Sequence, residues 1–336
     1  MSSPPLVIVG AGVLGLCTAF ELHRRGRAVL VVDPGEVNAS LVAAGMIAPA
    51  MESAIDDVSL DRAQLFRAGR DLWPEFAAAA GIALAHRSAE WRGGDVDGME
   101  ARLRALGFNA WREGDCVTTE EDYQVDPAQA LTALRQALGE AVIMGRVTEI
   151  VRTDHGWQVS VGDRVLDAGE VVLATGASEA VAGLPELARV LIDAIQPIRG
   201  QIGVATLNLV DHVVRGPGAY VAPMASGAVI GATMEPGRRD TAPDAETSKR
   251  LTEAAWRVLG RSPQPLDIDW RAGVRGASAD GLPLAGAAPG EKGLFMALAP
   301  RRNGWLLGPL VGAVVADAIE GRAASTEARA LDPGRF

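Results

Sequence analysis

Residues 6–33 read LVIVGAGVLGLCTAFELHRRGRAVLVVD, and this stretch decides the fold. The apolar run Leu6 to Val9 leads into a glycine-rich turn, an amphipathic helix continues to about Arg25, and a second apolar run ends at Asp33. A strand, a helix and a strand within about 30 residues are typical of the βαβ unit that binds a dinucleotide. The stretch therefore predicts an α/β, Rossmann-like domain.

The three glycines of this turn have separate roles. Gly10 permits the tight turn, Gly12 lets a pyrophosphate approach the backbone, and Gly15 lets the helix pack close to the strand. The helix N-terminus offers free N–H groups and a partial positive charge to the phosphates. Asp33 follows the second strand, where its carboxylate can accept hydrogen bonds from a ribose hydroxyl. The alternative is a glycine turn with a structural role alone.

Composition narrows the class of protein. The chain has 336 residues and a net charge of −10, so it can hold two domains, and nucleic acid or anionic membrane partners are disfavoured. Cys17 and Cys116 lie far apart, which favours neither a disulfide framework nor a thiolate zinc site. The first strand begins by residue 6, so we expect a cytoplasmic protein without a signal peptide. The apolar segment 305–319 is shorter than the ~20 residues of a membrane span and predicts a buried helix.

Periodicity predicts the remaining elements. Helices are expected at 59–80, 99–107, 126–139 and 244–260, and strands at 147–151, 157–161, 170–173, 201–205, 219–223, 228–234 and 267–274. The stretch 85–136 is expected to be helical. Two insertions, 85–136 and 196–271, then form a substrate domain, and 1–84, 137–195 and 272–336 form a discontinuous cofactor domain. The strand at 170–173 ends in Ala174, Thr175 and Gly176, a turn that is typical of flavoproteins and passes near their cofactor.

Five blocks carry a resemblance to a known family. They are the βαβ unit, Ala43–Met46, Tyr220–Pro223 with Gly231–Met234, Ala272–Arg275 with Asp280–Pro283, and Arg302–Gly304 with Leu306–Pro309. In this order and spacing the chain resembles the D-amino acid oxidase superfamily of FAD enzymes, and most of all the glycine oxidase family of thiamine biosynthesis. The resemblance implies an FAD-binding domain of the glutathione-reductase/p-hydroxybenzoate-hydroxylase type and a second, mainly antiparallel-sheet substrate domain. Gly276 and Pro300 depart from the family pattern, which usually has proline and a polar residue there.

The resemblance also implies non-covalent FAD. Together with the two turns described above, it gives as cofactor-binding residues Gly10, Gly12, Val13, Leu14, Gly15, Asp33, Pro34, Ala39, Ser40, Ala44, Gly45, Met46, Val147, Ala174, Thr175, Gly176, Pro300, Arg301, Arg302, Asn303, Gly304, Trp305 and Leu306.

For the substrate, the resemblance implies that Arg275 pairs with a carboxylate, that Tyr220 hydrogen-bonds the same group, and that Arg302 lies beside it. Met46 and Met234 would line a small apolar space. No side chain is assigned as catalytic, since hydride passes to the flavin and the amine can bind neutral. The alternatives are a surface role for Arg275 and plain packing for the tyrosine and both methionines.

The other titratable residues are expected to have surface or packing roles. The four histidines lie in no recognisable motif, and no metal-ligand spacing is present. Asp56, Asp57, Glu120, Glu121 and Asp122 are expected on solvated faces.

The leading hypothesis is an FAD-dependent oxidase that deaminates glycine or another small amino acid or amine, giving an imine and, with molecular oxygen, hydrogen peroxide. Two alternatives stay open. One is an FAD-dependent D-amino acid dehydrogenase that passes electrons to a quinone or protein acceptor, and the other is an NAD-binding or non-catalytic protein. A homo-oligomer is compatible with the sequence.

Overall fold

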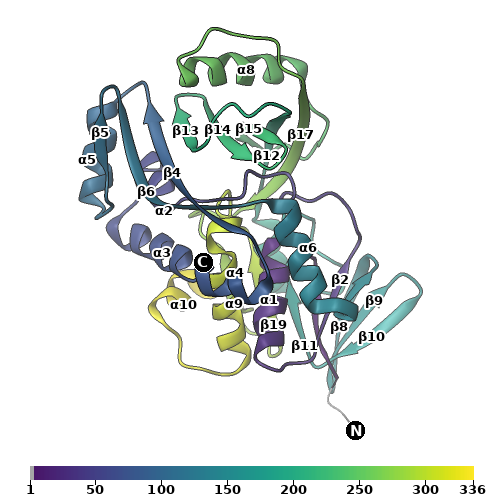
Figure 1. The fold of residues 1–336 in the computed structure, drawn as a ribbon. Helices are drawn as coiled ribbons and strands as arrows, with labels where there is room; N and C mark the ends of the chain where they lie inside the picture. Colours follow the sequence, from purple (N-terminus) through teal and green to yellow (C-terminus); the bar gives the residue numbers. More distant parts are fainter. Residues whose placement is uncertain (1–3) are drawn as a thin grey trace. The chain divides into compact units, whose positions relative to one another are not determined.

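The structure, a computed structural model, describes residues 4–336 (Figure 1). The chain divides into two compact units. Unit 1 comprises the chain up to Leu41, Leu131–Ile198 and Arg275–Phe336. Unit 2 comprises Val42–Ala130 and Arg199–Val274.

Unit 1 is built on a six-stranded sheet in the order β18-β19-β11-β1-β2-β7. Its strands are β1 (Leu6–Val9), β2 (Val29–Asp33), β7 (Val142–Met144), β11 (Glu170–Leu173), β18 (Leu284–Ala287) and β19 (Leu294–Leu298). β1 pairs in parallel with both β2 and β11, and its four residues are all buried, which explains their uninterrupted apolar run. The predicted βαβ unit is therefore confirmed.

The other elements of unit 1 are helices, two 3₁₀ turns and a second sheet of three strands. They are α1 (Val13–Arg24), α6 (Pro127–Leu138, which begins in unit 2), α7 (Glu186–Asp193), α9 (Gly304–Ile319), α10 (Thr326–Leu331), the 3₁₀ turns Gly139–Ala141 and Pro333–Arg335, and an antiparallel sheet of β8 (Val147–Thr153), β9 (Gly156–Val161) and β10 (Arg164–Ala168).

Helices α1 and α9 pack closely because glycines face Cys17. A Cβ on Gly308 would lie 3.0 Å from the Cys17 sulfur, and one on Gly312 would lie 2.9 Å from the Cys17 carbonyl oxygen. The burial of Cys17 in this contact raises the pKa of its thiol. The predicted buried helix is confirmed as α9, and no helix within residues 4–336 is long and apolar enough to cross a membrane.

Unit 2 contains a ten-stranded sheet with the main order β16-β12-β15-β14-β13-β4-β6-β3, to which β17 adds beside β12 and β5 beside β6. The strands are β3 (Met46–Ile47), β4 (Leu84–Arg92), β5 (Trp111–Glu113), β6 (Cys116–Val125), β12 (Gln196–Ala205), β13 (Val213–Gly216), β14 (Ala219–Met224), β15 (Gly227–Gly231), β16 (Glu235–Pro236) and β17 (Ile268–Ala277). The helices are α2 (Pro49–Ile55), α3 (Leu60–Asp71), α4 (Trp73–Ala80), α5 (Val96–Ala105) and α8 (Ala245–Leu259). Helix α8 covers β13–β15 and buries Leu251 and Trp256 against them (Figure 1).

Two features of unit 2 differ from the sequence expectation. The stretch 85–136 was expected to be helical, and this was wrong, because β4 and β6 pair over most of their length within it. Residues 42–84, assigned from sequence to the cofactor domain, cluster with unit 2. The pairing of β3 with β6 and the packing of α2 near Met99 give the physical reason.

Candidate active site

The backbone of the glycine turn in unit 1 packs closely against neighbouring backbone. Gly10 has φ +108°, and a Cβ there would lie 2.4 Å from the Ala174 carbonyl oxygen. A Cβ on Gly15 would lie 2.0 Å from the Gly10 carbonyl oxygen. Larger residues are excluded at both positions. The contact also brings the Ala174–Gly176 turn beside the glycine turn, as a shared cofactor site requires.

The N-terminus of α1 suits an anion. Gly12 is its N-cap and contributes no side chain, and the first turn contains no acidic residue. The Val13 N–H donates to Ser40 Oγ at 2.9 Å, and the Trp305 indole N–H donates to the Ser40 carbonyl oxygen at 3.0 Å. Ser40 therefore ties α1 to α9 near their N-termini. The unsatisfied N–H groups and the helix dipole favour phosphate at this point.

Asp33 lies at the end of β2, 4% exposed, and its carboxylate is paired with the Arg135 guanidinium of α6. The position is the one expected for a ribose-binding carboxylate. Pro34, which follows, is exposed, and Val147 begins β8. Their roles in binding a cofactor stay predictions.

The substitution Asp33→Ala is expected to weaken FAD binding. The loss of charge-assisted hydrogen bonds to the ribose costs about 1.5–3 kcal/mol, or roughly tenfold to 150-fold in Kd. Titration of apoprotein with FAD measures it. Arg135→Ala is the control, because it removes the same ion pair and leaves the carboxylate. Equal FAD affinity in wild type and Asp33→Ala would contradict the assignment.

The two predicted substrate arginines, Arg275 and Arg302, lie on neighbouring segments of the backbone, and the turn before α9 carries the second of them. Ala299 and Arg301 have φ of 57° and 52°, left-handed conformations that are uncommon outside glycine and gather at functional sites. The Arg301 N–H donates to the Gly276 carbonyl oxygen at 2.8 Å, so the strand end that carries Arg275 lies against the turn that carries Arg302.

Gly276, which stands where the family pattern has proline, is closely packed. A Cβ there would lie 2.8 Å from Ile195 Cγ2 and 3.1 Å from the Gly176 carbonyl oxygen. A larger residue would therefore require the Ile195 side chain to move and would press on the Gly176 backbone.

Asn303 is the N-cap of α9 and is 3% exposed. Its side-chain Nδ2 is buried and has no hydrogen-bond partner within residues 4–336. An unsatisfied buried donor costs about 1–3 kcal/mol, so this amide fits an acceptor on a bound group. Together with the glycine turns and the α1 N-terminus, it shows that the residues present fit a dinucleotide with a polar ring system.

The predicted residues Ala44, Gly45, Met46, Tyr220 and Met234 lie in unit 2. Gly45 has φ +67° and its Cβ would lie 1.9 Å from the Val125 carbonyl oxygen, while the Ala44 carbonyl oxygen accepts from Gln124 Nε2 at 3.0 Å. Met46 and Tyr220 pack against the same apolar cluster.

Beside them, a Cβ on Gly231 would lie 2.4 Å from the Tyr220 hydroxyl oxygen, so only glycine leaves room for that phenol. Met234 follows and is half-buried.

A buried charged cluster beside Met46 was missed from sequence. Arg215 donates through Nη1 to Glu52 Oε1 at 2.7 Å and lies 3.2 Å from the Met46 sulfur through Nη2. Asp122 was expected on a solvated face, and this was wrong, since it is 2% exposed. Burial raises the pKa of Asp122 to about 7, and the Glu52 charge adds to the shift while Arg215 opposes it. Asp122 stands in an acidic run, and only the sheet pairing of β6 turns it inward.

The histidines and cysteines lie outside this arrangement. His86 contacts the Glu120 carbonyl oxygen, and His212 lies between Asp211 and Glu90. Among residues 4–336, no group of three or more histidines, cysteines or carboxylates is arranged to hold a metal ion.

A family model described as FAD-dependent oxidoreductase (DAO) matches residues 5–318. The chain belongs to this family. It is therefore an FAD-dependent oxidoreductase, and the predicted fold class, enzyme class and cofactor are confirmed.

Among the relatives of this oxidoreductase is the glycine oxidase of Geobacillus kaustophilus, 29% identical over 94% of this chain and 92% of that protein. The crystal structure of glycine oxidase from the same organism superposes with a TM-score of 0.82 at 25% identity, covering both chains fully. The tRNA 5-methylaminomethyl-2-thiouridine biosynthesis bifunctional protein MnmC of Caulobacter sp. is also 29% identical, and this chain spans 59% of its length.

We expect the FAD of this oxidoreductase to be held without a covalent bond. The sequence has no cysteine in the block 299–309 and no histidine beside the first glycines, so neither place offers a side chain for such a link. Acid precipitation should leave a colourless pellet and a yellow supernatant. A pellet that keeps the flavin would contradict this expectation.

Proposed function

We propose that this FAD-dependent oxidoreductase oxidises glycine or a similarly small amino acid to its imine, with molecular oxygen as the final acceptor and hydrogen peroxide as the second product. The hydrogen bond between the Arg301 N–H and the Gly276 carbonyl oxygen carries the proposal. It holds the backbone bearing Arg275 against the turn bearing Arg302, and two guanidinium groups suit an amino acid carboxylate. The glycine oxidases among the relatives support the same substrate class.

In this proposal the residues of unit 1 hold FAD. The Gly10–Gly15 turn and the α1 N-terminus would bind the pyrophosphate, Asp33 would bind a ribose, and Asn303 would donate to the flavin ring. When bound, FAD supplies the two-electron acceptor for the hydride of the substrate α-carbon, at flavin N5. The N–H groups of the first turn of α9 would offer partial positive charge to the flavin ring.

Arg275 fixes the substrate by its carboxylate. A guanidinium fork sets the angle as well as the distance of the pair, so the α-carbon is held in one place. Tyr220 donates its phenolic hydroxyl to the same group, and Arg302 adds positive charge beside it. Met46 and Met234 limit the space around the α-carbon. The amine enters neutral, so the reaction needs no protein base, in keeping with the location of His86 and His212 elsewhere.

Charge disfavours a polyanionic substrate such as tRNA. The bifunctional relative acts in tRNA biosynthesis by its name, but this chain has a net charge of −10, which repels phosphate backbones. A free small amino acid carries no such penalty.

Anaerobic mixing of the purified protein with glycine, sarcosine or D-alanine tests the proposal. We expect at least one of them to bleach the visible absorbance of the flavin, and admission of air to restore it with release of peroxide. If none bleaches the flavin, the proposed substrate class is wrong. If bleaching occurs and a dye but not oxygen restores the colour, the protein is a dehydrogenase, the alternative raised above.

A further inference from the structure

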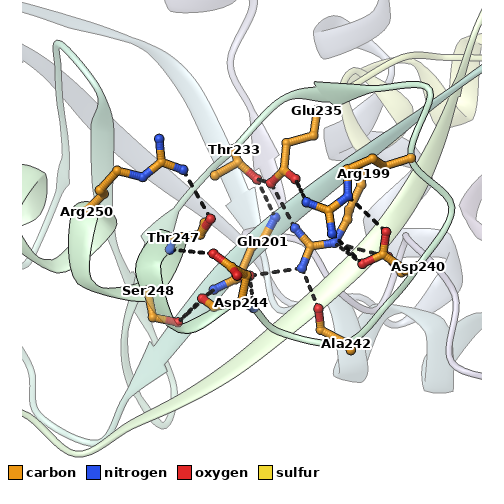
Figure 2. Close-up of polar contacts among 11 residues, drawn as sticks. Arg199, Gln201, Thr233, Glu235, Asp240, Ala242, Asp244, Thr247, Ser248 and Arg250 are labelled. Carbon is orange, nitrogen blue, oxygen red and sulfur yellow. Dashed lines mark hydrogen bonds and ion pairs between the residues drawn. The ribbon is translucent and has the colours of Figure 1, made fainter.

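A polar network in unit 2 fastens the segment 233–244 to strand β12 (Figure 2). Arg199 and Gln201 stand two residues apart on β12, on the same face, and both side chains are fully buried. The segment they contact runs from the end of β15 to the start of α8 and includes Met234. The proposed function assigns a role to Met234 and none to Arg199 or Gln201.

Each of the three guanidinium nitrogens of Arg199 donates a hydrogen bond to this segment, and one of them also donates to Gln201. Nη1 donates to Glu235 Oε1 at 2.8 Å, Nε donates to the Asp240 carbonyl oxygen at 3.1 Å, and Nη2 donates to Gln201 Oε1 at 3.1 Å and to the Ala242 carbonyl oxygen. The Asp240 carboxylate lies 3.2 Å from Nε. One guanidinium therefore fixes three points of the segment.

Gln201 fixes both ends of the same segment. Its backbone N–H donates to Thr233 Oγ1 at 2.9 Å, and its Oε1 accepts from the Asp244 N–H at 2.8 Å. Its Nε2 donates to the Asp244 carbonyl oxygen at 3.0 Å and to Ser248 Oγ at 2.8 Å. Thr233 in turn donates to Glu235 Oε1 at 2.7 Å. Met234 stands between two residues that are each held in this way.

Charges in the network balance. Glu235 and Asp240 contact Arg199 from the buried side and Arg238 from the exposed side, the latter at 2.6 and 2.7 Å. Two carboxylates thus meet two guanidinium groups. Burial of a charge is costly unless the group is paired and fully hydrogen-bonded, and such pairs add little net stability while they define geometry. The network therefore defines the conformation of the segment 233–244 more than it adds to the stability of the folded protein.

We propose that Arg199 is a positioning residue that holds the segment 233–244 so that Met234 limits the size of the substrate. The inference rests on the proposed function, since it takes Met234 to lie beside the substrate α-carbon. Loss of the tether frees the backbone on the C-terminal side of Met234. Glycine is then held less closely and longer side chains are admitted.

The test compares Arg199→Met with Arg250→Met. Arg250 lies in the same unit and contacts Thr247 at 3.1 Å, so the same substitution there leaves the segment tethered. Exposed Arg238 and Arg239 make the segment a trypsin substrate when it loosens. We expect Arg199→Met to retain FAD and to be cleaved after these residues about tenfold faster than wild type, as a loss of about 1.4 kcal/mol in local stability would give.

Steady-state kinetics with glycine and D-norvaline supply the second measurement. We expect the KM for glycine to rise more than kcat falls, and the preference for glycine over D-norvaline to drop about tenfold, the scale of selection by apolar space. Arg199→Lys should recover part of both effects, because an ammonium cannot replace the guanidinium fork. If Arg199→Met does not fold, Glu235→Gln makes the same comparison, since it weakens the tether from the segment's side.

The inference is wrong if trypsin cleaves wild type and Arg199→Met at equal rates. It is also wrong if Arg199→Met is cleaved faster but keeps the wild-type preference for glycine over D-norvaline. Failure of the proposed function is a different result. It shows in the wild type before any variant is made, as a flavin that no small amine reduces.

Discussion

Arg275→Ala is expected to lower kcat/KM by roughly 30-fold to several thousand-fold, the 2–5 kcal/mol that removal of one partner of a buried charged pair costs. The flavin spectrum and the thermal stability should stay close to those of wild type. Arg275→Lys should recover part of the loss, since a point charge does not reproduce the fork. Steady-state kinetics of the holoenzyme with glycine measure the effect.

Arg271→Ala is the matched control for Arg275→Ala. Arg271 lies on the same strand, β17, with its guanidinium 2.7 Å from Asp269 at an exposed position. Its removal should change kcat/KM little. Acetate and glycolate should compete with glycine in the wild type and in Arg271→Ala, and should lose affinity for Arg275→Ala. Near-normal turnover with unchanged carboxylate inhibition in Arg275→Ala would make Arg275 a surface residue.

The second large effect concerns stability and pH. The pKa of Asp122 is raised by burial from 3.8 to about 7, so its carboxyl remains protonated in the folded protein where it would ionise in the unfolded chain. Its contribution to stability is complete below pH 4 and is lost as pH rises towards 7. Asp122→Asn removes this dependence. At pH 8 it should exceed wild type in unfolding free energy by on the order of 4 kcal/mol, since one pKa unit equals about 1.4 kcal/mol.

Urea unfolding of wild type and Asp122→Asn across pH 5 to 8 measures the difference. The neighbouring Glu121→Gln provides a control of opposite sign. Burial raises the pKa of Glu121, but hydrogen bonds from Arg70 and from the Asn109 N–H lower it overall. Glu121→Gln should therefore be less stable than wild type by a constant amount across pH 5 to 8, and should converge with it only below the ordinary glutamate pKa of 4.5. A constant difference between wild type and Asp122→Asn at all pH values would show that Asp122 is ionised throughout.

The sequence predicts features that depend on local chemistry. The glycine turn from Gly10 to Gly15 could be found because its glycines and the strand and helix on either side of it follow one another within residues 6–33. Helix α9 could be found because its burial appears as a nearly continuous apolar run. Arg275 and Arg302 could be named from family motifs, and the structure joins their backbones through Gly276.

Features that depend on distant pairing could not be predicted in the same way. Strand β4, LAHRSAEWR, has no clear alternation, and its strand conformation comes from β6, about thirty residues later. The burial of Asp122 follows from that pairing, so an acidic run looked solvated. Arg199 is buried because the segment from Glu235 to Ala242, more than thirty residues later in the chain, packs against it. The sequence around Arg199 contains no pattern that predicts this contact.

The order of strands in unit 1 has a consequence for synthesis of the protein. Leu6 of β1 pairs with Glu170, and Val171 of the same partner strand pairs with Leu294. One edge of β1 pairs with β2 soon after synthesis, but the edge that faces β11 stays unpaired for roughly ten to thirty seconds, at about 5–20 residues per second. Strand β11 then exposes an open edge until almost the entire chain is made. Unpaired strand edges can pair with other chains, so we expect the incomplete chain to aggregate more readily than the finished protein until β19 has been made.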